Sequence, residues 1–301
     1  MEHIKKVNRV IDYITQQLNA PLSVEQLAAV AGLSKYHFHR VFKEQTGETV
    51  EKFIVRKRME KAGRELSRPT DIPVAEVAYG VGYSSVALFC RKFKAHFGMT
   101  ATEYRSRNRE KQSKNRQLPR TNQEYVSVLT RYLCDNKSIK IGDKMMNCTF
   151  EIKQIEPKKV VYYRHVGAFN QMGSSIGKLM QWAYPRGLVK NPPLVGANYL
   201  DDPDITPVDK LQSDVFLVVG QDVKVDGEIG QYTIEGGRYA VGRFEIAMNE
   251  FGDAWHAMCQ LIAEHGCQSV DGPHHELYLN NPDEHPEKKH LVDIYIPVKP
   301  L

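Results

Sequence analysis

The chain has 301 residues, of which 42% are hydrophobic, enough for about two domains with real cores. It holds no run of about 18 apolar residues, and its first ten residues lack the apolar stretch of a signal peptide, so neither a transmembrane helix nor secretion is expected. The five cysteines are scattered and form no CxxC pattern, which is typical of reduced thiols in a cytoplasmic protein.

Charge is divided unevenly along the chain. Residues 1–117 carry 22 Lys and Arg against 12 Asp and Glu, whereas residues 118–301 carry 19 against 24. A basic half joined to an acidic half favours a polyanionic partner, such as nucleic acid, at one end of the molecule. On charge alone, an ordinary solvated surface is the alternative.

Helix signals begin at the N-terminus. Apolar residues from Ile4 to Leu18 recur on one helical face. The segment "SVEQ" at 23–26 is a capping-box pattern, and Gly32 permits a tight turn between two crossing helices. Residues 50–67 then predict one helix of about 27 Å.

This helical half contains an internal repeat. Identities recur at an offset of 50 residues and, after one inserted residue, of 51; they include Val24/Val74, Gly32/Gly82, Phe38/Phe89, Arg40/Arg91 and Lys43/Lys94. Each copy predicts a helix-turn-helix, so this half is expected to be all-α, with two such motifs joined by the long helix. A plain helical bundle with a basic face is the alternative.

The second helix of each motif is the candidate DNA reader. In a helix-turn-helix it lies in the major groove and reaches base edges from its first residues. With Phe38 turned inward, the outward side chains of the first motif are Lys35, Tyr36, His39 and Arg40. Two motifs on a helix of about 27 Å could address successive major grooves, about 34 Å apart, without dimerisation.

The segment "GYSSVALFCRKFKAHFGMTATEYR" at 82–105 is close to the signature of the AraC/XylS family, and residues 1 to about 108 resemble its double helix-turn-helix DNA-binding domain, with the Rob/MarA branch as nearest relative. The resemblance implies a transcription regulator, expected to be an activator, that works with RNA polymerase. It also implies base contacts at positions matching Tyr36, His39 and Arg40 in the first motif, and Val86, Ala87 and Arg91 in the second.

The second motif departs from the family pattern. The family commonly has polar residues, often Gln, where this chain has Val86 and Ala87, and these apolar side chains cannot hydrogen-bond to a base edge. The first motif is therefore expected to perform most of the direct readout. The second would chiefly position the protein through phosphate contacts, with Arg91 and Lys92 as candidates.

Residues 109–147 are expected to link two domains. The segment "SRNREKQSKNRQLPRTN" at 106–122 is polar, contains a proline and shows no apolar periodicity. Residues 123–135 could form a short helix within this linker.

The second domain, residues 148–301, is also a repeat, here at an offset of 79; "YLDDPD" at 199–204 matches "YLNNPD" at 278–283. Each unit reads strand, helix, strand, strand. Two units predict an α+β domain built on one antiparallel sheet with both helices on the same side. A ligand cleft is expected at the pseudo-twofold axis between them.

This domain resembles the GyrI-like effector-binding domain, also found in BmrR-type drug sensors, through "YYRHVG", the Trp-bearing helix and "DIYIPV". The resemblance places an acid near the start of the last strand in the pocket, which here is Asp293. A carboxylate among aromatic rings favours a cation, including a lipophilic one, as the small-molecule effector. The candidate pocket walls are Tyr163, Trp182, Tyr199, Trp255, Tyr278 and Tyr295. Arg164 and Arg243 either pair with acids or recognise an anionic effector.

No other chemistry is indicated. His265, Cys267, His274 and His275 lie close together in sequence but fit no standard zinc spacing, and P-loop, dinucleotide and nucleophile-elbow motifs are absent. We therefore expect a cytoplasmic regulator that binds double-stranded DNA and a small effector, contacts no membrane, needs no cofactor or metal, and is not an enzyme. A constitutive activator whose C-terminal domain is a ligand sink or protein-interaction module, or a GyrI-like hydrolase fused to a DNA-binding domain, are the alternatives.

Overall fold

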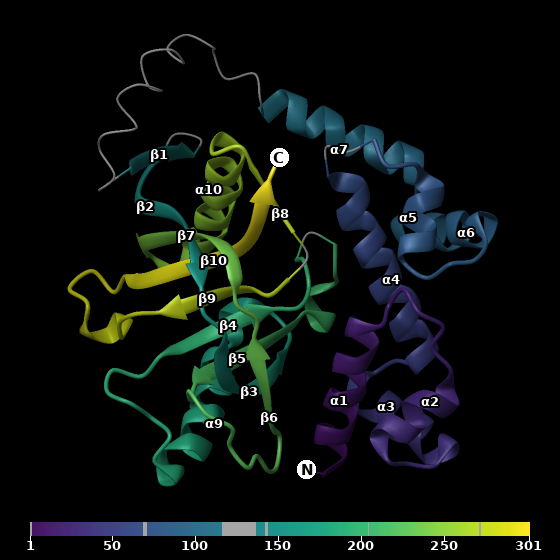
Figure 1. Ribbon diagram of the computed structural model, residues 1–301, viewed down its shortest axis with the longest axis horizontal. Coiled ribbons are helices and arrows are strands. Elements are labelled where there is room, and N and C mark those ends of the chain that lie inside the picture. The colour runs from purple at the N-terminus through teal and green to yellow at the C-terminus, as the bar shows by residue number, and fades with distance from the viewer. Residues whose placement is uncertain (1, 69–70, 116–136, 142–143, 204, 271) are drawn as a thin grey trace. The chain divides into compact units, whose positions relative to one another are not determined.

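The computed structural model describes residues 2–68, 71–115, 137–141, 144–203, 205–270 and 272–301. The contacts between these residues divide the chain into two compact units, Met1–Thr121 and Asn122–Leu301 (Figure 1). The short helix expected within residues 123–135 lies outside the described residues. None of the helices described is long and apolar enough to cross a membrane.

The first unit is helical. Its helices are α1 (Glu2–Gln16), α2 (Val24–Ala31), α3 (Lys35–Thr46), α4 (Val50–Ser67), α5 (Val74–Gly80), α6 (Val86–Phe97) and α7 (Ala101–Asn115). The pairs α2–α3 and α5–α6 are the two helix-turn-helix motifs, and α4 is the long helix expected between them.

Local sequence signals fix the helix ends. Ser23 caps α2 by accepting a hydrogen bond from the backbone N–H of Gln26 at 3.1 Å, which is half of the expected capping box. The other half is not formed, because the Gln26 side chain donates instead to the Tyr13 hydroxyl at 2.6 Å. Gly32 ends α2 in the left-handed region, with φ of 62°, where a side chain would be strained.

Each motif has its own hydrophobic core, and α4 contributes to both. Phe53 and Ile54, near the start of α4, pack with the buried faces of α1, α2 and α3. Met59 and Leu66, further along α4, pack with α5 and α6. The connecting helix is thus part of both motifs rather than a spacer between them.

Helix α7 runs to Asn115, so residues 109–115 are helical and the expected linker boundary at 108 is placed too early. A reciprocal capping box starts the helix: the Thr100 N–H donates to the Glu103 carboxylate at 2.8 Å and the Glu103 N–H donates to Thr100 Oγ1 at 3.2 Å. Arg109 pairs with Asp71 at 2.6 Å, which ties the helix to the segment before α5. Apolar periodicity did not predict this extension, because the segment is polar and Arg109 is paired with a residue far away in the sequence.

The second unit is built on a ten-stranded antiparallel sheet, in the order β1-β2-β7-β10-β9-β4-β5-β3-β6, with β8 pairing to β10. Its strands are β1 (Lys137–Ile141), β2 (Lys144–Ile155), β3 (Lys158–Val166), β4 (Val195–Tyr199), β5 (Gln212–Val218), β6 (Ile229–Ile234), β7 (Gly237–Ile246), β8 (Cys267–Ser269), β9 (His274–Tyr278) and β10 (His290–Pro300). Its helices are α9 (Gly173–Ala183) and α10 (Phe251–Glu264).

The sheet begins before residue 148, so the expected start of the second domain is also corrected. Strands β1 and β2 lie partly within the expected linker, and β2 pairs with β7 from Cys148 to Ile155. Met146 and Cys148 alternate into the hydrophobic core, which stabilises the start of β2.

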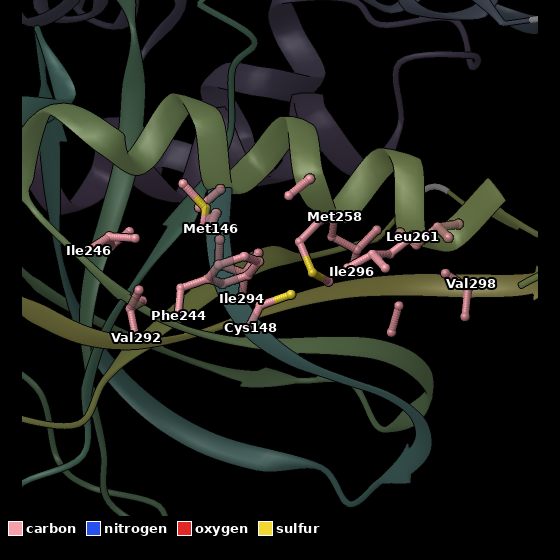
Figure 2. Close-up of a cluster of buried hydrophobic side chains, with 14 of the residues drawn as sticks. Met146, Cys148, Phe244, Ile246, Met258, Leu261, Val292, Ile294, Ile296 and Val298 are labelled. Atoms are coloured by element: carbon pink, nitrogen blue, oxygen red, sulfur yellow. The ribbon is translucent and has the colours of Figure 1, made fainter. Parts of the chain in front are cut away.

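Both helices lie against the same face of the sheet. Val292, Ile294 and Ile296 alternate along β10 and pack with Met258 and Leu261 of α10 (Figure 2). Across the ladders, Ile294 pairs with Glu276 on β9, and Glu276 pairs with Ala197 on β4. Since directly paired residues share a face, Ala197, which packs under α9, and Ile294, which packs under α10, are on one side.

The other face of the sheet has its own buried cluster. Tyr162, Phe216, Leu277 and Tyr295 are among its members and alternate with residues that face the helices. The 79-residue offset seen in the sequence relates β3 to β7, α9 to α10, β4 to β9 and β5 to β10. The equivalent strands β4 and β9 are neighbours at the centre of the sheet.

Candidate nucleic-acid interface and effector site

Helix α3 presents a polar stripe to solvent. Phe38 and Phe42 are fully buried and anchor the helix to the first core. Tyr36 on the opposite side is 88% exposed, and the exposed Arg40 and Lys43 follow it at helical spacing. Arg40 and Lys43, with Glu44, line an open hollow on this surface. An aromatic ring followed by two cations on an exposed helix is suited to contact a nucleic acid.

The two other expected contacts on α3 are held by acids of the same domain. Lys35 Nζ lies 2.5 Å from the Glu25 carboxylate on α2, and this ion pair lowers the pKa of Glu25. His39 Nε2 lies 3.5 Å from the Glu51 carboxylate at the start of α4. Both side chains would have to leave these partners before they could contact DNA.

Helix α6 presents a similar stripe. Ala87, Cys90, Arg91 and Lys94 are exposed at i, i+3, i+4 and i+7 of the helix. Lys92 is exposed beside this stripe. Val86 is placed differently from the expectation, because it is half-buried and packs on the core of the second motif. Its apolar side chain gains more from that core than from solvent.

The two stripes share their cations and differ in the remaining positions. At the offset of 51, Arg40 matches Arg91 and Lys43 matches Lys94, whereas Tyr36 and His39 match Ala87 and Cys90. Sequence reasoning omitted Lys43 and Lys94 as contacts, although their identity in both copies and their spacing from the arginines were visible signals. The repeated elements are therefore the positive charges that suit phosphate.

The second unit holds a buried carboxylate among aromatic rings. Glu276 on β9 is fully buried; one carboxylate oxygen accepts from Trp255 Nε1 at 2.6 Å and the other from the Tyr199 hydroxyl at 2.9 Å. The rings of Tyr199 and Trp255 meet edge to face at 5.5 Å, and Phe169 packs on Tyr199 at 4.7 Å. Tyr278 follows on the same face of β9. We call these five residues the Glu276 cluster.

Burial dominates the electrostatics of this cluster. Desolvation raises the pKa of Glu276 to about 7, although the hydrogen bonds from Trp255 and Tyr199 act to lower it. Burial and the nearby carboxylate also raise the pKa values of Tyr199 and Tyr278 well above the ordinary value of 10.0, so both phenols stay protonated. The donors that reach the carboxylate are neutral, and a buried anion with neutral partners favours a cation.

Three of the six expected pocket aromatics gather at Glu276. Tyr163 and Trp182 pack against the same hydrophobic core as Tyr199 and Tyr278, but their polar groups have other partners. Tyr199, Trp255 and Tyr278 belong to the Glu276 cluster. Tyr163 and Trp182 pack at α9, where Lys178 donates to the Tyr163 hydroxyl at 2.9 Å and Trp182 Nε1 donates to an exposed aspartate, Asp226, at 2.6 Å. Their polar groups are thus engaged away from Glu276.

Asp293 and Tyr295 lie on the wrong face of the sheet for the expected pocket. On β10 they alternate with Val292 and Ile294, which face α10. Tyr295 stacks on His275 at 4.7 Å, and Asp293 pairs with Arg243 through two hydrogen bonds of 2.7 and 2.8 Å. The expectation that Asp293 lines the aromatic pocket is therefore wrong, because strand alternation directs it to the other side.

The two arginines left open by the sequence are both paired with acids. Arg164 donates to Asp214 at 2.8 and 2.9 Å in a buried pair, and Arg243 donates to Asp293. The four residues are related by the 79-residue offset, so the two pairs occupy equivalent places on β3–β5 and β7–β10. Both arginines therefore have acid partners, which is the first of the two roles that the sequence left open.

Glu276 was not among the candidate site residues, because no motif in the segment "HHELYL" (274–279) distinguishes it from an ordinary strand residue. The available signal was its position two residues before Tyr278, which puts both side chains on the same face of a strand. The histidines and cysteine considered as zinc ligands are not brought together: the part of the chain that the structure describes contains no group of three or more His, Cys, Asp or Glu suited to a metal.

Both units of the chain match known protein families. Residues 27–107 match a helix-turn-helix domain family, and residues 149–299 match the family described as GyrI-like small molecule binding domain. The chain is 32% identical over 107 residues to the regulatory protein SoxS of Salmonella typhimurium, which covers 36% of this chain and 99% of SoxS. It is 29% identical over 108 residues to the multiple antibiotic resistance protein MarA of Escherichia coli, which covers 36% of this chain and 84% of MarA. Among solved structures, the EcmrR C-terminal domain aligns with a TM-score of 0.43 at 16% identity, covering 51% of this chain and 99% of that domain.

A double helix-turn-helix unit joined to a domain of the small-molecule-binding type defines a DNA-binding transcription regulator. The chain belongs to the AraC-type regulators, of the kind that carry a GyrI-like C-terminal domain.

Proposed function

We propose that this regulator binds one specific duplex site through both motifs and activates transcription in response to a cationic small molecule. The DNA part of the proposal is supported chiefly by the outward stripes of α3 and α6, which repeat an Arg and a Lys at the same helical positions. A bacterial-type activator of this design would work in the cytoplasm and contact RNA polymerase.

The two motifs would divide the work of recognition. Tyr36 and Arg40 on α3 can reach base edges, and Arg can bind guanine with two hydrogen bonds. On α6, Arg91, Lys92 and Lys94 would contact phosphate, while Ala87 could touch no more than a thymine methyl group. The first half-site should therefore be read more strictly than the second.

The effector would bind at the Glu276 cluster. Its carboxylate is buried, its donors Trp255 and Tyr199 are neutral, and rings surround it, which together favour a cation with an apolar body. Such a ligand would have to displace part of the aromatic packing to reach the carboxylate. The duplicated units would place this site at the pseudo-twofold axis, because β4 and β9 are equivalent neighbours.

Fluorescence titration would test this site. Trp182 and Trp255 are the two tryptophans of the chain, so a Trp182→Phe background leaves Trp255 as the reporter. Methyltriphenylphosphonium should quench Trp255, and Glu276→Gln should weaken its binding about 10-fold or more. Neutral triphenylphosphine oxide should bind wild type and variant alike.

Asp293→Asn is the matched control, since it removes the other acid of this region without touching the Glu276 cluster. It should leave phosphonium affinity unchanged, because Asp293 faces the opposite side of the sheet. Unchanged affinity in Glu276→Gln together with loss in Asp293→Asn would overturn the proposed site. An effector that binds there but alters neither DNA affinity nor transcription would leave a constitutive activator.

A further inference from the structure

One side chain of α4, Arg58, contacts both the turn that leads into the first helix-turn-helix motif and the turn within the second. Arg58 lies in the middle of α4, between Ile54, which packs in the first core, and Met59, which packs in the second. Its guanidinium extends away from α4, and its partners lie in turns on either side of this helix in the sequence.

The contacts of Arg58 span the whole unit. Its Nε donates to the Leu18 carbonyl at 2.9 Å, and a terminal nitrogen donates to the Ala20 carbonyl at 2.8 Å. Both carbonyls belong to the turn between α1 and α2, which leads directly into the first motif. The guanidinium also lies over the ring of Tyr83, 5.6 Å from its centroid, in the turn between α5 and α6 of the second motif.

Gly82 shows how closely the two turns approach. Its φ is +86°, and a Cβ built on it would lie 2.6 Å from the Leu18 carbonyl oxygen and 2.7 Å from a terminal nitrogen of Arg58. The equivalent glycine of the first motif, Gly32, also has a positive φ, but a Cβ there would meet nothing within 4 Å. Gly32 therefore serves only its own turn, whereas Gly82 also makes room for the turn that leads into the first motif and for Arg58.

The chemistry of Arg58 suits a fixed joint. Two of its donors are used on backbone carbonyls, which cannot move without moving the turn that carries them. Its planar group lies over the Tyr83 ring at the same time, and a lysine cannot combine this contact with the two hydrogen bonds in the same geometry. Burial lowers the pKa of Arg58, and its partners are dipoles and a ring rather than a carboxylate.

We propose that Arg58, with Gly82 and Tyr83, is a joint that fixes the distance and angle between recognition helices α3 and α6, and so sets the half-site spacing that the regulator accepts. The proposal rests on the DNA binding proposed above. Arg58 is a positioning residue: it acts through α3 and α6 and needs no contact with DNA itself. One added base pair shifts and rotates one half-site relative to the other, which a rigid pair of helices should not tolerate.

Half-site spacing is the direct test. The full-length protein would be used to select a duplex site, and affinities would be measured for that site and for versions with one base pair added or removed between the half-sites. Wild type should lose about 10-fold or more in affinity on each altered site, whereas Arg58→Gln should bind all three within about 3-fold. Arg64→Gln removes one charge from the same helix and should keep the wild-type spacing penalty.

Two further variants keep the proposal testable if Arg58→Gln does not fold. Arg58→Lys keeps the charge and should reduce the spacing penalty to an intermediate value. Gly82→Ala should reduce the penalty, whereas Gly32→Ala should not, because only Gly82 adjoins Arg58 and the turn that leads into the first motif. If Arg58→Gln or Arg58→Lys keeps the wild-type spacing penalty, the proposal that Arg58 fixes the relative position of α3 and α6 is wrong.

A readout without DNA separates failure of the joint from failure of the proposed function. Spin labels can be placed at Gln45→Cys on α3 and at the exposed native Cys90 on α6, with Cys134 and Cys259 replaced by Ser. The distance distribution should be narrow in this background and broad when Arg58→Gln or Arg58→Lys is added. Distance distributions of equal width in the background and in the Arg58 variants would contradict the proposed role of Arg58, whether or not the protein binds DNA.

Discussion

Arg40 carries the sharpest expectation at the scale of single residues. It is exposed on α3, it lines an open hollow together with Lys43 and Glu44, and it is the side chain proposed above to bind a base edge in the first half-site. Arg40→Ala should cost about 1–3 kcal/mol of binding free energy and relax specificity at one base pair. Competition binding to single-base variants of a selected site measures both effects.

Arg238→Ala is the control for that experiment, because it removes one exposed arginine from the second unit. It should leave affinity and specificity unchanged. An Arg40→Ala protein with wild-type affinity would show that Arg40 is only a surface charge.

Glu276 predicts how stability depends on pH. Its pKa is raised from 4.5 to about 7 in the folded unit, so the folded state holds this proton more tightly than the unfolded state. Stability should therefore fall as pH rises from about 4.5 to about 7, by up to about 3 kcal/mol, and then level off. Glu276→Gln should lack this fall, as measured by urea unfolding followed through tryptophan fluorescence.

An exposed acid of the same unit supplies the comparison for that measurement. Glu235→Gln should reproduce the pH dependence of wild type. If Glu276→Gln and wild type lose the same stability between pH 5 and pH 7, the buried carboxylate is not the group responsible.

At the scale of elements, helix caps give a matched pair of substitutions. Thr100 starts α7 with a reciprocal capping box, whereas Ser34 stands at the N-cap of α3 without a side-chain hydrogen bond to the helix. Thr100→Ala should therefore cost about 1 kcal/mol of unfolding free energy, and Ser34→Ala clearly less. Thermal unfolding of both variants checks this, and equal losses would show that the capping box adds nothing.

Elements governed by local signals could be predicted from sequence, and those governed by distant contacts could not. The bounds of α4 match the expected residues 50–67, because apolar positions and the following Pro-containing segment are local features. The end of α7 and the strands before residue 148 were missed, since Arg109–Asp71 and the β2–β7 ladder join residues far apart in the chain.

The same division explains the candidate sites. The outward side of α3 followed from helical periodicity around Phe38 and Phe42. Glu276 could not be recognised in this way, because its surroundings come from Tyr199 and Trp255 through sheet register and helix packing. The resemblance placed Asp293 in the pocket. Its neighbours Val292 and Ile294 face α10, so Asp293 lies on the opposite face of the sheet.

At the scale of the whole molecule, the charge asymmetry of the sequence coincides with the division into two units. The basic half contains the helix-turn-helix pair, and the acidic half contains the Glu276 cluster. This arrangement would keep DNA, a polyanion, and the proposed cationic effector on different parts of the chain.

The most direct measurement is a salt titration of the full-length protein on a selected duplex and on random duplex DNA. Affinity should fall steeply with salt on both duplexes, with about 10³-fold or greater preference for the selected sequence. Equal affinity for the two duplexes at every salt concentration would contradict sequence-specific recognition through α3 and α6.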